Sequence, residues 1–250
     1  FREALTQLKP CLDKDSRVAW ATKGLEHGSG KFMGEVFEDV LGDTHPSAVA
    51  SGPTFAGEVA AGLPCALTVA SYNPVFANDL ASRMHGDRMR AYTSDDMVGV
   101  QLGGTVKNVL AIASGIADGM QLGANSRAAL VTRGLAEIIR LGDAMGARRE
   151  TLMGLAGVGD LILTCTDDQS RNRRLGLALG SGKAIDVALK DIGQVVEGVN
   201  TAREVMQLAQ QYRVELPICE QVYQVLQEGL LPTKAVENLL AREIRPELSS

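Results

Sequence analysis

The sequence predicts an α/β domain with a mainly parallel sheet, followed by an all-helical domain. Over the first hundred residues, short apolar runs alternate with amphipathic helical patterns. Strands that alternate with helices are typical of a parallel sheet with helices on its faces. Beyond Asp95 the apolar residues recur at helical spacing, and no strand pattern is found. We therefore expect residues 1–100 to form the C-terminal part of an α/β domain and residues 101–250 to form an all-helical domain.

Four apolar runs are the predicted strands, at residues 17–21, 48–50, 66–70 and 89–92. The segments between them predict helices at residues 1–8, 32–41, 54–61 and 73–84. The last of these helices has a recognisable start, because Asn73 is a favourable capping residue and Pro74 suits the first helical position.

The second half begins with long helices rich in glycine and alanine, from residue 96 to about residue 145. Small residues such as Gly103, Gly104 and Ala111 suit close packing of one helix on another. The later helices are interrupted at residues 157–159, 181–182 and 216–217.

The amino-acid composition limits the classes of protein to which this chain can belong. The chain has 250 residues, of which 45% are hydrophobic, so it is long enough to bury a substantial core. A net charge of −5 argues against nucleic-acid binding and against an anionic membrane surface as partner. No apolar run reaches the roughly 20 residues that a membrane span needs, and no signal peptide opens the chain. We expect a cytoplasmic protein.

The four cysteines, Cys11, Cys65, Cys165 and Cys219, form no closely spaced pair. Zinc sites are built from such pairs, so no metal site is expected. The cysteines are predicted to be reduced and buried as small hydrophobic residues. The three histidines are scattered, which argues against a hydrolase triad.

Two Gly-Ser-Gly-Lys stretches, at residues 28–31 and 180–183, look like phosphate-binding loops. The first lacks both the earlier glycine and the following Ser or Thr of a P-loop. The second lacks the third glycine of a dinucleotide loop and follows no strand. Both are predicted to be plain turns or helix ends.

A lone lysine inside an apolar helix is the first candidate for chemistry. Lys107 and Asn108 lie in a segment, residues 102–119, that is otherwise small and apolar. A buried ammonium is costly without a partner or a substrate, and burial lowers a lysine pKa towards the range that suits proton transfer. The alternative is that Lys107 extends along the helix surface to solvent. The pattern alone leaves both interpretations open.

A second candidate follows in residues 157–174. Asp160 lies in an apolar stretch, and Ser170, Arg171 and Asn172 then form a dense group of hydrogen-bond donors. Such a group can bind an anion, because arginine presents a forked set of donors. The alternative is the solvated start of a basic helix, and the sequence does not decide between the two.

Two further segments follow predicted strands. Lys23 comes just after the strand at residues 17–21, and Gly52 and Thr54 come just after the strand at residues 48–50. Ligands of open α/β sheets bind at the carboxyl ends of strands, so both segments are well placed for binding.

These four segments, in this order and spacing, resemble the NAD(P)-dependent glycerol-3-phosphate dehydrogenase family of the bacterial type. The resemblance covers essentially the whole chain, and three motifs carry it: GGTVKN at 103–108, AGVGDLILTCT at 156–166 and SRNRR at 170–174. It implies a Rossmann-like N-terminal domain and a helical C-terminal domain. It also implies interconversion of dihydroxyacetone phosphate and sn-glycerol 3-phosphate, which feeds glycerophospholipid synthesis.

The resemblance assigns roles to individual residues. Lys107 matches the proton-transferring lysine, which would stabilise charge on the ketone oxygen during reduction and accept the hydroxyl proton in reverse. Whether Asp160 orients Lys107 is left open. The remaining positions match those that bind substrate or cofactor in the family. The substrate-site positions are Lys23, Gly52, Thr54, Lys107, Asp160, Ser170, Arg171 and Asn172, and the cofactor-site positions are Lys23, Ala56, Arg171, Val195 and Glu197.

The chain departs from the family pattern at its beginning. The glycine-rich loop of the family precedes the first residue seen here, and nothing downstream replaces it. We therefore expect an N-terminally truncated chain that neither binds dinucleotide tightly nor turns over. The residue that distinguishes NAD from NADP would lie in the same missing part, although the resemblance favours NADPH.

Two alternatives to the dehydrogenase remain. One is a related dehydrogenase that acts on a phosphorylated sugar acid, against which the specific motifs argue. The other is a non-catalytic folding or dimerisation fragment. Homodimers are common in the family, so a homodimer is the expected assembly.

Overall fold

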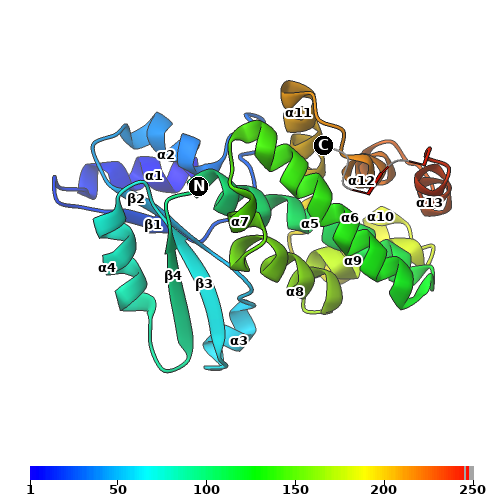
Figure 1. The fold of residues 1–250 in the computed structure, drawn as a ribbon, viewed down its shortest axis with the longest axis horizontal. Coiled ribbons are helices and arrows are strands. Elements are labelled where there is room, and N and C mark those ends of the chain that lie inside the picture. The colour runs from blue at the N-terminus through cyan, green and yellow to red at the C-terminus, as the bar shows by residue number, and fades with distance from the viewer. Residues whose placement is uncertain (245, 248–250) are drawn as a thin grey trace. The chain divides into compact units, whose positions relative to one another are not determined.

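The computed structural model describes residues 1–244, 246 and 247, and it divides into two compact units (Figure 1). Unit 1 comprises Phe1–Thr105 and Gly146–Asp160, and unit 2 comprises Val106–Met145 and Leu161–Ser250. The long helix α5 (Met97–Gly119) begins in unit 1 and ends in unit 2. The chain returns to unit 1 after residue 145, so unit 1 is formed from two separate stretches of the sequence.

Unit 1 is built on a sheet of four strands in the order β1 (Val18–Trp20), β2 (Ser47–Ser51), β3 (Cys65–Ala70) and β4 (Met89–Ser94). All four predicted strands are therefore confirmed. The outer pairs are parallel, whereas β2 and β3 run antiparallel. The helix that connects β2 to β3, α3 (Ala56–Ala60), has only 5 residues and rises roughly 8 Å. Parallel neighbours usually need a crossover with a longer helix packed on the sheet, and the short α3 is consistent with the antiparallel direction of β3.

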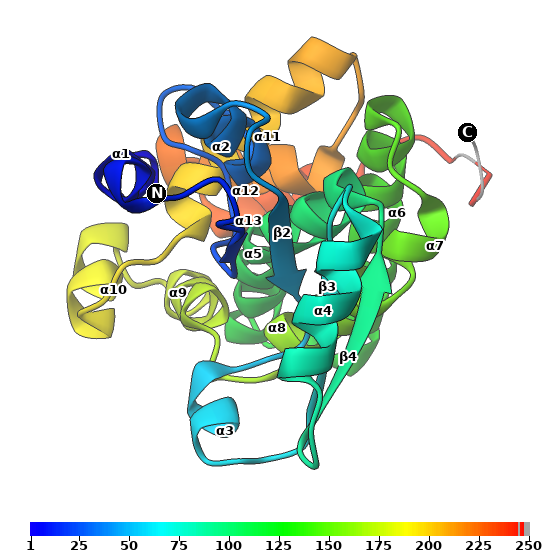
Figure 2. The same cartoon turned by 90° about the vertical axis from the view of Figure 1, so that its left-hand side faces the viewer.

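Helices cover both faces of this sheet (Figures 1 and 2). Alternation along β2 sends Ala48 and Ala50 to one face, where they join a core that contains Phe76 of α4 (Pro74–Met84). Val49 points to the other face, into a core formed by α1 (Arg2–Leu8), α2 (Met33–Leu41) and the start of α5.

The start of α4 is as predicted. Its cap is Asn73, whose Oδ1 accepts a hydrogen bond from the Phe76 backbone N–H at 3.0 Å. The last helix of unit 1 is α7 (Arg149–Leu152), and two short turns of helix, η1 (Lys9–Cys11) and η2 (Leu155–Gly159), complete the unit.

Unit 2 is helical, and within the part of the chain that the structure describes no strand follows Ser94. After the end of α5 its helices are α6 (Gly123–Met145), α8 (Asp160–Thr166), α9 (Arg171–Gly180), α10 (Ile185–Ile192), α11 (Gly198–Tyr212), α12 (Pro217–Gln227) and α13 (Pro232–Leu240). Glycines let α5 and α9 pack backbone against backbone. A β-carbon on Gly115 would come within 2.1 Å of the Arg173 carbonyl oxygen, and one on Gly176 within 2.1 Å of the Ile112 carbonyl oxygen.

The cysteines are all free, but they are not all buried as expected. Cys165 and Cys219 are buried, Cys65 is half-buried, and Cys11 is exposed because it lies in the turn η1 at the surface of unit 1. Among the described helices none is long and apolar enough to cross a membrane.

Candidate active site

Lys23 and Asp160 form a buried ion pair in unit 1. Because β1 and β2 are parallel, their carboxyl ends meet at one edge of the sheet, and Lys23 and Gly52 follow these two ends. Lys23 Nζ donates to Asp160 Oδ2 at 2.6 Å and to the Gly52 carbonyl oxygen at 3.2 Å. The Asp160 side chain is only 2% exposed. The structure thus brings Lys23, Gly52 and Asp160 together.

The Lys23 ammonium has one N–H group that no described residue engages. An ammonium has three N–H groups, and within the described residues two of them are engaged by Asp160 and Gly52. Thr54 Oγ1 also donates to the Gly52 carbonyl oxygen, at 3.2 Å. Only glycine fits at position 52, because a β-carbon there would lie 2.9 Å from Leu67 Cα. Ala56 lies nearby in the sequence, exposed as the first residue of α3.

A π-helical turn sets the place of Asp160. The turn η2 immediately precedes Asp160, where the sequence predicted only a break in the helix. Its backbone is tightly packed, since a β-carbon on Gly157 would meet the Leu152 carbonyl oxygen at 1.9 Å and one on Gly103 would meet the Ala156 carbonyl oxygen at 2.4 Å. Single π-turns are frequent at functional sites. Here the turn fixes the residue at which α8 starts, and hence the carboxylate that Lys23 contacts.

Lys107 is buried within unit 2. It is 7% exposed, and its Nζ donates to Thr164 Oγ1 at 3.1 Å. The interpretation in which Lys107 extends to solvent is therefore wrong. Sequence reasoning did not single out Thr164, although it lies four residues after Asp160 and so on the same face of α8.

The start of α9 is anchored by its own polar side chains. Ser170 caps the helix and accepts from the Arg173 backbone N–H at 3.2 Å, while Asn172 Oδ1 accepts from the Gly198 backbone N–H at 2.9 Å. Asn108, which follows Lys107, donates from Nδ2 to Glu197 Oε2 at 3.2 Å. These contacts hold the segment that contains Val195 and Glu197, and the Val195 side chain is exposed.

The two arginines of the first turn of α9 differ. Arg173 Nε donates to Asp168 Oδ1 at 2.9 Å, and its Nη1 donates to Asp118 Oδ2 at 2.5 Å and to the Cys165 carbonyl oxygen at 3.1 Å. Burial opposes ionisation of Asp118, but hydrogen bonds from Arg127 and Arg173 outweigh it and hold the pKa of that carboxyl below its usual range.

Arg171 is half-buried, and its guanidinium has no hydrogen-bond or ion-pair partner among the described residues. Ser170, Asn172 and Arg173 are buried, so the solvated-helix interpretation is wrong for these three residues.

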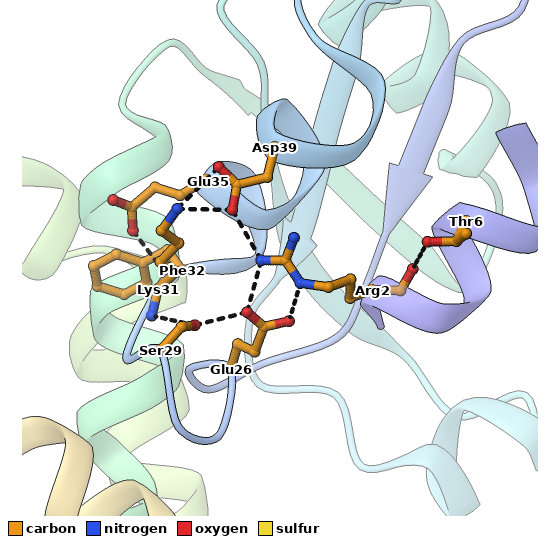
Figure 3. A network of polar contacts seen from close by, with 8 residues as sticks. All are labelled: Arg2, Thr6, Glu26, Ser29, Lys31, Phe32, Glu35 and Asp39. Atoms are coloured by element: carbon orange, nitrogen blue, oxygen red, sulfur yellow. Dashed lines mark hydrogen bonds and ion pairs between the residues drawn. The ribbon is translucent and has the colours of Figure 1, made fainter.

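The first Gly-Ser-Gly-Lys stretch is a plain turn held by surface ion pairs (Figure 3). Arg2 donates to Glu26 and to Asp39, and Lys31 donates to Asp39 at 2.7 Å. Ser29 closes the turn by donating to Glu26 Oε2 at 2.6 Å. The second stretch is the end of α9 and the turn that follows. Both predictions are confirmed. In the described part of the chain no group of three or more acidic, histidine or cysteine side chains is placed to hold a metal ion.

Comparison with known proteins decides the family. Residues 1–77 match the N-terminus and residues 96–237 the C-terminus of NAD-dependent glycerol-3-phosphate dehydrogenase. The chain belongs to this family. The resemblance drawn from the motifs is confirmed.

Individual relatives are similar over nearly the whole chain. A protein from Thioalkalivibrio sulfidiphilus, named glycerol-3-phosphate dehydrogenase [NAD(P)+], is 60% identical over 99% of this chain and 74% of its own length. The crystal structure of glycerol-3-phosphate dehydrogenase from Coxiella burnetii is 52% identical, with a TM-score of 0.92 over 96% of this chain and 74% of that one. The yeast enzyme is 28% identical, with a TM-score of 0.83 over 94% of this chain and 71% of that one.

These matches confirm two of the predictions. The fold is a Rossmann-like sheet domain followed by helices. The protein is an oxidoreductase that uses NAD or NADP, and this interpretation is favoured over a non-catalytic fragment.

Proposed function

We propose that the protein interconverts dihydroxyacetone phosphate and sn-glycerol 3-phosphate with NAD(P)H, and that Lys107 transfers the proton. The family and the names of its relatives support the reaction. The observation that carries the role of Lys107 is its burial at 7% exposure, with Nζ directed at the Thr164 hydroxyl. A cation held in place and shielded from water is more effective on a developing charge than a solvated one.

The chemistry assigned to Lys107 follows the charge on the substrate oxygen. The nicotinamide, when bound, supplies or accepts the hydride. In the reduction, the Lys107 ammonium stabilises the negative charge that grows on the carbonyl oxygen and donates a proton to it. In the oxidation, neutral Lys107 accepts the proton of the hydroxyl group.

The binding roles fit two cations of the structure. The Lys23 ammonium is held in place by Asp160 and Gly52, and the Arg171 guanidinium has no partner among the described residues. Both suit an anionic ligand such as a phosphate. The other proposed substrate-binding residues are Gly52, Thr54 and Asp160 in unit 1 and Ser170 and Asn172 in unit 2. The exposed side chains of Ala56, Val195 and Glu197, together with Lys23 and Arg171, suit contacts with the cofactor, for which NADPH is the favoured form.

The assembly and location are proposals of the same kind. We propose a homodimer in the cytoplasm, with residues 1–100 belonging to the nucleotide-binding domain and residues 101–250 to the substrate and catalytic domain. Analytical ultracentrifugation of the intact enzyme tests the dimer, because a monomeric mass at micromolar concentration contradicts it.

Replacing Lys107 tests the function. Lys107→Ala in the intact enzyme is expected to lower kcat by about 10²–10⁴, the usual contribution of a general acid or base. The affinity for NADPH is expected to stay nearly unchanged. Lys183→Ala is the matched control, because Lys183 is an exposed lysine whose ammonium pairs with Asp191 on the surface of unit 2. A Lys107→Ala enzyme that retains more than about half the normal kcat rules the assignment out.

A further inference from the structure

One buried hydroxyl in unit 1 has no protein partner. Ser51 is the last residue of β2 and is 3% exposed, and its Oγ makes no hydrogen bond within the described residues. An unpaired buried hydroxyl costs about 1–3 kcal/mol, so nearly all such groups in proteins are paired with protein or with ordered water. The position of Ser51 therefore requires an explanation.

Ser71, beside the same sheet, has a buried hydroxyl whose hydrogen bonds are made within the protein. Ser71 directly follows β3 and is equally buried. Its Oγ donates to the Ser47 carbonyl oxygen at 2.5 Å and accepts from the Asn73 backbone N–H at 3.1 Å. Ser51 and Ser71 thus differ in hydrogen bonding and not in burial.

Ser51 faces a small cavity beside Lys23. The cavity is lined by the Thr22–Gly24 segment, Val49, Ser51, Val100 and Gln101, and it has room for about one water molecule. Gly104 keeps this space open. A β-carbon there would lie 3.0 Å from Ser51 Oγ and 3.4 Å from Lys23 Cδ.

The polar groups at this cavity match what a buried water needs. Such a water typically makes two to four hydrogen bonds. Ser51 offers a donor and an acceptor, and the Lys23 ammonium has one N–H not used by Asp160 or Gly52 among the described residues. The Gln101 amide contributes little, since it already accepts from the Gly34 backbone and donates to the Met97 carbonyl oxygen.

We propose that Ser51 is a positioning residue for Lys23, and that its hydroxyl holds one ordered water that hydrogen-bonds to the Lys23 ammonium. The water fixes the ammonium in the orientation set by Asp160 and Gly52. The water then takes the third N–H, so Lys23 acts on an anionic ligand through its charge. Without the water, Lys23 keeps its ion pair with Asp160, but the position of its charge is less well fixed. The kinetic consequence rests on the proposed role of Lys23 in binding substrate, whereas the water itself does not.

A paired substitution separates positioning from structure. Ser51→Ala in the intact enzyme is expected to raise KM for dihydroxyacetone phosphate several-fold while Tm stays nearly unchanged, because a hydroxyl bound to water contributes little to stability. Ser71→Ala is expected to do the reverse. It removes two protein hydrogen bonds, so it lowers Tm by several degrees and leaves KM unchanged. Ser51→Ala with an unchanged KM contradicts the positioning role.

Two further measurements make the test independent of the substrate. A high-resolution crystal structure is expected to show a water about 2.8 Å from Ser51 Oγ, and the absence of density there overturns the proposal. Lys23→Ala, assayed in parallel, reports whether Lys23 binds substrate at all. If Lys23→Ala leaves KM unchanged, the proposed binding role of Lys23 has failed, and the crystal structure alone decides on the water at Ser51.

Discussion

Arg171 and Arg173 lie two residues apart in the first turn of α9, yet their surroundings are opposite. Arg173 is buried between Asp118 and Asp168, and Asp118 is shared with Arg127, so two cations balance two anions. Arg171 has no such partner among the described residues. Two residues of one motif therefore have different uses. Arg173 fixes the helix in place, whereas no described residue uses the donors of Arg171, which suits its proposed role in binding a ligand.

The largest effect that tests this contrast is on stability. Arg173→Met is expected to lower the free energy of unfolding by about 3 kcal/mol, because it leaves the mostly buried Asp118 with only one of its two arginines. Arg171→Met is the matched variant and is expected to change it by less than about 0.5 kcal/mol. Urea unfolding followed by circular dichroism measures both. Equal losses of unfolding free energy in the two variants would contradict the distinction between the two arginines.

A second test concerns a buried carboxyl group that accepts hydrogen bonds from backbone amides. Glu137 accepts from the Ile218 backbone N–H at 2.6 Å and from the Cys219 backbone N–H at 3.2 Å, at the start of α12. Burial raises its pKa to about 7, and these amides and nearby Arg140 offset only part of that rise. Burial is the main reason why the pKa of the Cys219 thiol is raised, and the charge of Glu137 and a hydrogen bond between the two side chains raise it further.

The sign of the pH effect follows from this shift. Between about pH 4.5 and pH 7 the unfolded chain ionises Glu137 while the folded chain keeps it protonated, so stability falls as pH rises, by up to about 3 kcal/mol. Glu137→Gln is expected to remove this slope, whereas Glu220→Gln, an exposed control on the same helix α12, is expected to keep it. Thermal unfolding midpoints of the two variants, measured at about pH 5, 6 and 7, report the difference in slope. An unchanged slope in Glu137→Gln would show that Glu137 does not titrate in this range.

The smallest expected effect is on affinity. Arg171→Lys keeps the charge but loses the planar fork, so KM for dihydroxyacetone phosphate or for NADPH is expected to rise several-fold. Arg174→Lys is the control, because Arg174 belongs to the same motif and is exposed. Unchanged KM values for both ligands in Arg171→Lys would mean that its free guanidinium serves neither.

The sequence predicts the elements better than it predicts their connections. All four strands and the Asn73 cap were readable, because alternation and capping are local properties. The antiparallel pairing of β2 with β3 was not, since it depends on how the whole connection between the two strands folds. The ion pair of Lys23 with Asp160 also lay outside local patterns, because its residues are 137 positions apart.

The residues of the candidate site also divide into those that the sequence predicts and those that it does not. The motifs pointed to Lys107, Asp160 and Arg171 through their residue types, and the structure adds what each one contacts. Thr164 and Ser51 were missed because a serine or threonine in an apolar stretch resembles ordinary core, and only burial and missing partners distinguish them. The pairing of Arg173 was missed for a related reason, since Asp118 lies on a different helix.

The discontinuity of unit 1 has a consequence for how the protein is made. A ribosome adds about 5–20 residues per second, so Asp160 emerges on the order of ten seconds after Lys23. During that interval the nascent chain already carries α5 and α6, while the η2 turn and the carboxylate that Lys23 will contact do not yet exist. Co-translational folding of the first unit can therefore be completed only after residues 106–145 of the second have been synthesised.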